Sequence, residues 1–146
     1  MKVSSPREKL LTQLDPSAFV ANPELIRMLE EHSAPAPCEA DGALFRQGEP
    51  PTGLYIFHQG SVTLSIISEN CQSLFAAQAL PGSLLGLPAI VTDKPYSLTA
   101  TARAGAKVSF IGRNEFTQLM LSQHEISMMI LQVLANEVRS ARSALY

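Results

Sequence analysis

Hydrophobic residues recur with two different periods along the chain, and the change of period indicates how the chain is organised. Near the N-terminus, Asn22-Pro23-Glu24 supplies a cap, a first-turn proline and a first-turn acid ahead of several apolar residues. This pattern predicts a helix. The following Pro35-Ala36-Pro37 stretch disfavours helical backbone and predicts a boundary. We therefore expect an N-terminal helical segment over residues 1–34.

From residue 40 onwards, apolar and polar residues alternate with the period of two that a half-buried strand shows. The clearest run is residues 61–66, where Val62, Leu64 and Ile66 alternate with serine and threonine. Six or more such runs, at roughly ten-residue spacing and separated by Gly, Pro and Asn turns, predict a β-roll over residues 40–112. We expect an antiparallel barrel or jelly roll, with a tight hairpin at His58-Gln59-Gly60.

After Gly112 the helical period returns and predicts C-terminal helices over residues 113–146. Asn114 is placed to cap a short helix. Ser122 and Glu125 have the spacing of a capping box that would open a long last helix.

The first half of the last helix carries two apolar stripes. One consists of Ile126, Ile130 and Val133, and the other of Leu131, Leu134 and Val138. In the second half only one stripe continues, through Val138, Ala141 and Leu145. At about 1.5 Å per residue such a helix reaches roughly 33 Å, which is longer than a small barrel can cover. We therefore predict a homodimer through Leu131, Leu134, Val138, Ala141 and Leu145.

Composition narrows the function classes. The 46% of hydrophobic residues suffices for a single core, and a net charge of −2 argues against a surface built for nucleic acid. No run of signal-peptide or membrane-spanning length is seen, which predicts a cytoplasmic protein. Cys38 and Cys71 are too few for a disulfide framework, a structural zinc site or a four-cysteine cluster, and we interpret them as reduced thiols.

The sequence offers little for catalysis. His32, His58 and His124 are far apart, and we interpret His58 as an exposed residue at a hairpin end, so no metal site is predicted. No nucleophile elbow, Walker loop or dinucleotide fingerprint is present, and we do not expect an enzyme. A cupin-type metalloenzyme stays a third alternative that predicts a bound metal.

The segment from Gly82 to Ile90 leaves a strand, turns at glycines and enters a short helix. The backbone N–H groups of Gly86, Leu87, Ala89 and Ile90 would then converge and form a cradle for an anion. An ordinary structural loop would use the same glycines, so both interpretations stay open here.

The order of motifs resembles the cyclic nucleotide-binding domain of the Crp-Fnr regulators over about residues 10–146. The residues that carry this resemblance are Leu44 to Glu49, Leu54 to Ile56, Gly60 to Val62, Gly82, Gly86 and Arg113 to Phe116, followed by the long helix. The resemblance implies a mainly β fold with flanking helices, a cupin-like jelly roll (double-stranded β-helix) and a C-terminal dimerisation helix. It also implies a phosphate-binding cassette at residues 86–91.

Two charged determinants of the family's cyclic AMP site are absent. Leu87 stands where the family has the glutamate that binds the ribose, and Tyr96-Ser97-Leu98 replaces the Arg-Ser-Ala that neutralises the phosphate. Pro88 removes one more N–H donor. Each charge-assisted hydrogen bond contributes about 1.5–3 kcal/mol, so tight cyclic AMP binding is not expected. We interpret Arg46 and Arg103 as surface residues rather than substitutes for the missing arginine.

The resemblance therefore implies a degenerate cassette that holds either a less charged small effector or none, in which case the domain is a dimer scaffold. Its lining would be Gly86, Leu87, Pro88, Ala89, Ile90, Tyr96, Ser97 and Leu98, with Ala141 or Arg142 as a candidate lid. The favoured hypothesis is a non-enzymatic sensor or regulatory domain that dimerises and binds no cofactor. The alternative is a working cyclic nucleotide receptor that uses backbone donors and Tyr96. The family's DNA-binding domain would follow Tyr146, so we expect no direct nucleic-acid or membrane contact from this chain, either as a stand-alone sensor or as half of a longer regulator.

Overall fold

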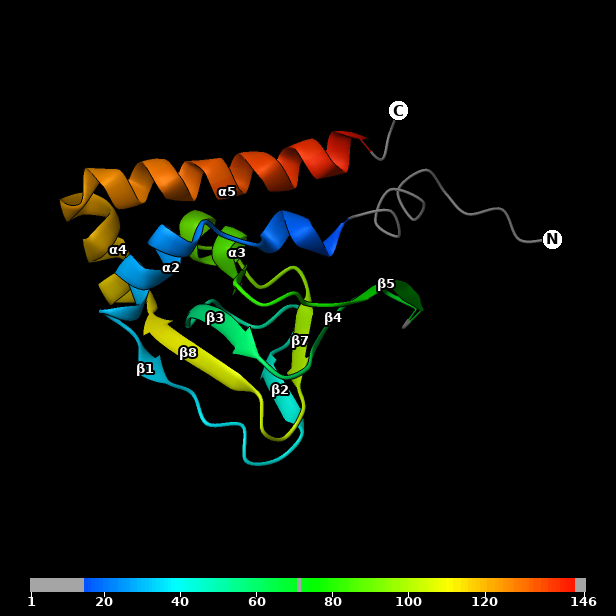
Figure 1. Cartoon of the computed structure of the whole chain (residues 1–146). Coiled ribbons are helices and arrows are strands. Elements are labelled where there is room, and N and C mark those ends of the chain that lie inside the picture. The colour runs from blue at the N-terminus through cyan, green and yellow to red at the C-terminus, as the bar shows by residue number, and fades with distance from the viewer. Residues whose placement is uncertain (1–14, 71, 144–146) are drawn as a thin grey trace.

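The structure is a computed structural model that describes residues 15–70 and 72–143. Two antiparallel sheets form its body, and the helices gather on one side of them (Figure 1). The first sheet has the order β1 (Ala34–Pro35), β8 (Lys107–Gly112), β3 (Gly53–Gln59) and β6 (Ser83–Leu85). The second has the order β2 (Gly42–Phe45), β7 (Thr99–Ala102), β4 (Val62–Ile67) and β5 (Ser73–Gln78). The prediction of a mainly β fold with flanking helices is confirmed.

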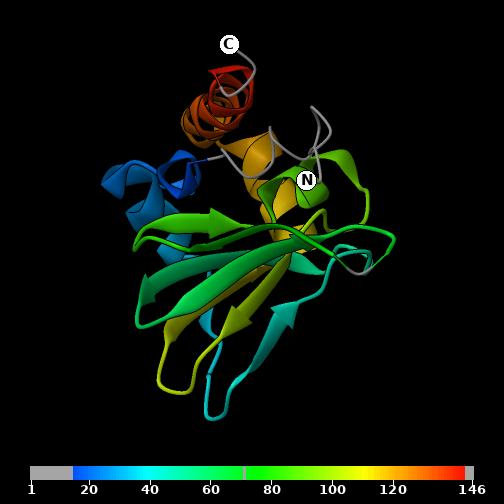
Figure 2. The ribbon, with the colours of Figure 1, turned by 90° about the vertical axis from the view of Figure 1, so that its right-hand side faces the viewer.

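The helical elements are η1 (Pro16–Phe19), α2 (Pro23–Glu30), α3 (Leu87–Thr92), α4 (Arg113–Ser122) and α5 (His124–Ser143). Asn22 caps α2 as predicted, because its side chain accepts a hydrogen bond of 2.8 Å from the Glu24 N–H. Figure 2 shows α5 above the other helices, with the sheets below them.

The period of two that predicted the strands is present in the structure. In β4, Val62 and Leu64 are fully buried, whereas Thr63 and Ser65, which alternate with them, are partly exposed. Strand β4 therefore has one face that packs inside the molecule.

The predicted hairpin at His58-Gln59-Gly60 is wrong. Strand β3 continues through Gln59 and pairs with β8 and β6, whereas β4 pairs with β5 and β7 in the other sheet. Gly60 has a φ of +105°, and a Cβ there would lie 2.7 Å from the Ala106 Cα. The turn thus leads the chain from one sheet to the other, which alternation along a strand does not reveal.

The predicted caps of the C-terminal helices are also wrong. Helix α4 begins at Arg113 with Gly112 as its cap, so Asn114 lies inside it, and Ser122 is its last residue rather than the cap of α5. The two helices are instead joined by Ser127, whose hydroxyl donates a hydrogen bond of 2.6 Å to the Met120 carbonyl. A free carbonyl at the end of α4 recruits this side chain from the next helix.

The first sheet lies between two hydrophobic cores. On one face it packs against the helices, where Leu25 and Leu29 of α2 meet Ile126, Ile130 and Val133 of α5. On the other face it packs against the second sheet, in a core that includes Phe57, Val62 and Leu64. One of the two predicted stripes of α5 therefore faces the helix's own domain.

Candidate functional site

The turn between β6 and α3 requires glycine at position 86. Gly86 has a φ of +90°, in the left-handed region, and a Cβ on it would lie 2.8 Å from Cε1 of Tyr96. The positive φ and the close approach of the Tyr96 ring each disfavour a side chain at position 86. The ring of Tyr96 is thereby placed directly against the start of α3.

Helix α3 offers fewer free donors than the sequence predicted. It is six residues long, Pro88 is its second residue and has no N–H, and the Ile90 N–H donates to the Gly86 carbonyl at 3.2 Å. The side chains of Leu87 and Ile90 lie in the helix-side core, and that of Ala89 lies between the sheets. The cassette side chains therefore serve the two cores.

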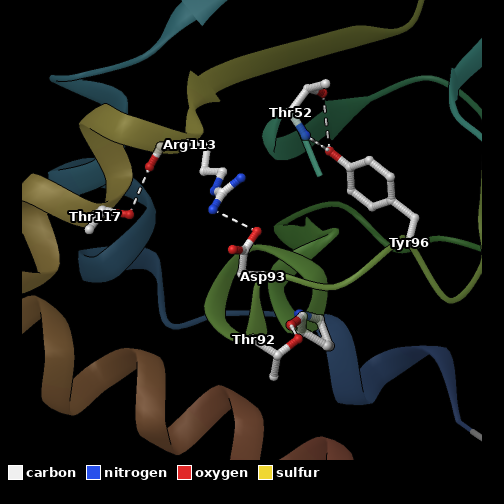
Figure 3. A network of polar contacts seen from close by, with 7 residues as sticks. Thr52, Thr92, Asp93, Tyr96, Arg113 and Thr117 are labelled. Atoms are coloured by element: carbon white, nitrogen blue, oxygen red, sulfur yellow. Dashed lines mark hydrogen bonds and ion pairs between the residues drawn. The ribbon is translucent and has the colours of Figure 1, made fainter. Parts of the chain in front are cut away.

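Tyr96 is 3% exposed, and its hydroxyl is held by the start of β3 (Figure 3). Its Oη donates a hydrogen bond of 2.7 Å to the Gly53 carbonyl. It also accepts hydrogen bonds from the N–H groups of Thr52 and Gly53, both of 3.1 Å. A phenol has one proton to donate and two lone pairs to accept with. All of this capacity is used within the chain.

Aromatic rings fill the space around Tyr96. Phe45, which is 4% exposed, stacks on Tyr96 with centroids 4.1 Å apart, and Tyr55 lies 5.7 Å from Phe45. Burial raises the pKa of Tyr55 above its ordinary value of 10, with smaller contributions from Tyr96, Glu49 and Cys38. Sequence reasoning did not assign Phe45 or Tyr55 to the site. Their place in alternating strands next to the cassette motifs was the available signal.

The other predicted site residues lie around this cluster or outside the described side chains. Ser97 is exposed and Leu98 packs partly against the core between the sheets. Arg46 and Arg103 are exposed. The backbone of Ala141 and Arg142 belongs to α5, but their side chains, and all of Leu145, lie outside what the structure describes.

One cation that the sequence reasoning did not assign lies beside the cassette. The guanidinium of Arg113, the first residue of α4, is 2.6 Å from the Asp93 carboxylate, directly after α3 (Figure 3). The Arg113 N–H also donates to the Thr52 carbonyl at 3.1 Å. This positive charge is therefore paired.

His58 lies in β3 and is not the exposed hairpin residue that was predicted. Its Nε2 is 2.5 Å from Oε1 of Glu30 in α2 and 2.9 Å from Oγ of the buried Ser109. A Ser-His-acid relay needs the serine and the carboxylate on opposite ring nitrogens, whereas both partners here share one. This arrangement fixes α2 to the first sheet and lacks the geometry of a nucleophile site.

The other histidines and cysteines are the remaining candidates for reactive groups or metal ligands. His32 Nδ1 is 3.9 Å from Oε1 of Glu115. Burial raises the pKa of the half-buried Cys38 thiol, and Cys71 lies outside the described residues. Within residues 15–70 and 72–143, no three His, Cys, Asp or Glu side chains are grouped so that they could hold a metal ion. Over the same residues, no helix combines the length and apolar character needed to span a bilayer.

Comparison with known proteins gives a family and a fold. A family model described as a cyclic nucleotide-binding domain matches residues 35–123. The "Anaerobic regulatory protein" of Aggregatibacter actinomycetemcomitans is 28% identical over 104 residues, which are 71% of this chain and 40% of that protein.

Two solved structures are similar in fold. The catabolite activator protein of Thermus thermophilus has a TM-score of 0.74 at 21% identity, covering 90% of this chain and 62% of its own. The N-terminal domain of a transcriptional regulator from Streptomyces coelicolor A3(2) has a TM-score of 0.65 at 21% identity, and the match covers 92% of this chain and 93% of that domain. The chain thus spans 40% of the Aggregatibacter protein and 62% of the Thermus protein, which is less than two thirds of each.

Proposed function

We propose, since the chain belongs to the cyclic nucleotide-binding domain family, that it is a non-enzymatic regulatory domain of Crp-Fnr type whose nucleotide pocket is degenerate. The observation that carries the proposal is the position of Tyr96, which is buried against Gly86 with its hydroxyl fully used by residues 52–53. The family resemblance puts the phosphate-neutralising arginine at this position.

Electrostatics supports the same conclusion. A cyclic phosphate would need at least one cation or several free N–H groups to replace its hydration. Leu87 is fully buried in an apolar core, Pro88 has no N–H, and the guanidinium of Arg113 is already paired with Asp93. The proposal assigns the domain no cofactor. Any effector it binds would be less charged than cyclic AMP.

We further propose that the domain acts as a homodimer through α5. Met128, Leu131 and Val138 are 48%, 56% and 53% exposed, and with Ala135 they follow the 3-4-3 spacing of a coiled-coil seam. Ile126, Ile130 and Val133 occupy the opposite, buried face. An apolar stripe of this spacing on a 20-residue helix fits a second copy of the same helix.

Calorimetric titration of cyclic AMP and cyclic GMP into the wild-type chain tests the proposal. We expect no heat of binding up to millimolar nucleotide. Micromolar binding by the wild type would overturn the degenerate pocket and establish the alternative, a working receptor with a non-standard cassette.

Two variants sharpen this experiment. Tyr96→Arg restores the family's cation, and Leu87→Glu/Tyr96→Arg restores both determinants. Leu87 is fully buried, so the double variant introduces a carboxylate into a core, and its folding must be checked by circular dichroism. The single variant keeps Leu87, and nucleotide binding by Tyr96→Arg alone would identify Tyr96 as the residue that excludes the ligand. Tyr96→Phe is the matched control, because it keeps the ring and adds no charge.

A further inference from the structure

The segment that leaves α3 is held to the start of α4 by a short ion pair. Asp93 follows α3 in the left-handed region, with a φ of +56°, and its N–H donates to the Ala89 carbonyl. Its Oδ1 lies 2.6 Å from Nη2 of Arg113. Aspartate adopts positive φ more readily than most residues other than glycine, and here this conformation ends α3 and turns the chain towards Tyr96.

The ion pair, which Figure 3 shows, is one side of a closed set of contacts. Arg113 donates its N–H to the Thr52 carbonyl at 3.1 Å, and Thr52 donates its own N–H to Oη of Tyr96 at 3.1 Å. Tyr96 follows Asp93 by three residues, and the intervening Pro95 has a fixed φ. The contacts therefore lead from Asp93 through Arg113 and Thr52 back to the segment that holds both Asp93 and Tyr96.

We propose that this ring of Asp93, Arg113, Thr52 and Tyr96 makes the end of α3 and the start of α4 move as one unit, with Asp93 and Arg113 as positioning residues. Helix α4 in turn is tied to α5 through Ser127 and Met120. The ring thus links the cassette to the helix proposed to dimerise. It goes beyond the proposed function, because it requires neither a ligand nor a second copy.

The closure of the ring distinguishes it from an ordinary surface ion pair. The side chains of Arg113 and Asp93 are 41% and 64% exposed, and an isolated pair with such exposure contributes little to stability. In a ring, opening one contact frees segments that the pair itself does not touch. The effect of the pair should therefore appear at Thr52 and Gly53, on the far side.

Hydrogen exchange of backbone amides tests this inference on the full chain. In Asp93→Asn, which keeps a residue tolerant of positive φ but removes the charge, the amides of Thr52 and Gly53 should exchange about two- to fivefold faster. The matched control is Glu24→Gln, which breaks the exposed 4.0 Å ion pair with Arg27 inside α2. This control should leave the Thr52 and Gly53 amides unchanged.

A double-mutant cycle supplies the second readout. Arg113→Gln should accelerate the same amides, and Asp93→Asn/Arg113→Gln should exchange no faster than either single variant, because both substitutions open the same contact. Acceleration confined to residues near Asp93, or additive effects in the double variant, would overturn the inference. Nucleotide binding by the wild type would overturn the proposed function but would leave these exchange results unaffected.

Discussion

At the scale of single residues, the hydroxyl of Tyr96 binds three backbone groups at the start of β3. Its hydroxyl satisfies two N–H groups and one carbonyl at positions 52 and 53, and Gly53 is buried. Removing one partner leaves these groups without a hydrogen bond, which costs about 1–3 kcal/mol.

We therefore expect Tyr96→Phe to lower the free energy of unfolding by about 1–3 kcal/mol in urea titrations. The matched control is Tyr55→Phe. Tyr55 is half-buried in the same aromatic cluster, and its hydroxyl makes no hydrogen bond to the residues that the structure describes. If both variants lose the same stability, the hydroxyl contacts of Tyr96 are not what holds the start of β3.

Gly86 provides a second prediction at this scale. Gly86→Ala meets both a φ of +90° and a Cβ contact of 2.8 Å with Tyr96, whereas Gly48→Ala meets the same φ of +90° with no atom within 4 Å. Left-handed strain alone costs about 1–2 kcal/mol. Thermal and urea unfolding should show a clearly larger loss for Gly86→Ala than for Gly48→Ala. Equal losses would mean that the tyrosine ring moves away at no cost.

These residues show what the sequence could and could not predict about the site. The absence of charged determinants at Leu87 and Tyr96 followed from the family resemblance together with the residue types at these two positions. The burial of Tyr96 and the use of its hydroxyl by Thr52 and Gly53 were not, because these contacts join positions more than 40 residues apart. Arg113 was part of the family motif, but its pairing with Asp93 depends on the same long-range packing.

At the scale of elements, α5 has one face packed on the helix-side core and one apolar face that is exposed. Leu134 packs partly against the helix-side core, whereas Leu131 and Val138 are more than half exposed. Substitutions at Leu131 and Val138 therefore test association without disturbing the core, and Leu134 does not.

We expect Leu131→Glu and Val138→Glu to convert a dimer into a monomer in sedimentation equilibrium at micromolar concentration, because a carboxylate in an apolar seam is not solvated. Their far-UV circular dichroism should match that of the wild type. Gln118→Glu on the exposed surface of α4 is the control and should leave the mass unchanged. A monomeric wild type would refute the proposed dimer.

The same helix carries a carboxyl group that should make its packing depend on pH. Burial raises the pKa of Glu137 from 4.5 to about 7, and its Oε1 has no hydrogen-bond partner among the described residues. Between pH 4.5 and 7 the folded state keeps this proton while the unfolded state loses it, so stability falls as the pH rises through this range.

We expect Glu137→Gln to be neutral below pH 4.5 and to become stabilising towards pH 8, by about 3 kcal/mol relative to the wild type. Urea unfolding at a series of pH values measures the difference between the two proteins. A difference that stays constant across this range would show that Glu137 titrates normally in the folded state.

Elements were easier to predict than their connections. Alternation in residues 61–66 and the cap at Asn22 depend on neighbours in sequence, and both predictions are confirmed. The turn at Gly60 and the junction at Ser122 depend on which sheet or helix receives the chain next. A strand pattern is the same for either sheet, and the Ser122 pattern fits a cap although the residue ends α4.

At the scale of the whole molecule, the first sheet joins the two cores. In β3, Leu54 and Ile56 face the helices while Phe57 faces the second sheet, and in β6 Leu84 and Leu85 divide in the same way. The cassette helix follows this rule, with Leu87 on one side and Ala89 on the other. The same strands thus contribute side chains to both cores. If either core were lost, one face of these strands would be exposed to water.

This shared layer predicts a single cooperative unfolding transition. Tyr55 and Tyr96 both belong to the core between the sheets, so tyrosine fluorescence reports mainly on that core, while circular dichroism at 222 nm reports on the helices. The two signals should give coincident urea transitions. Ile130→Ala, which truncates a fully buried side chain of α5, should lower both midpoints together at a cost of about 2–5 kcal/mol. If the helical signal alone moved, the helices would unfold separately from the sheets, and contacts such as the Asp93–Arg113 pair would not transmit a change from the cassette to α5.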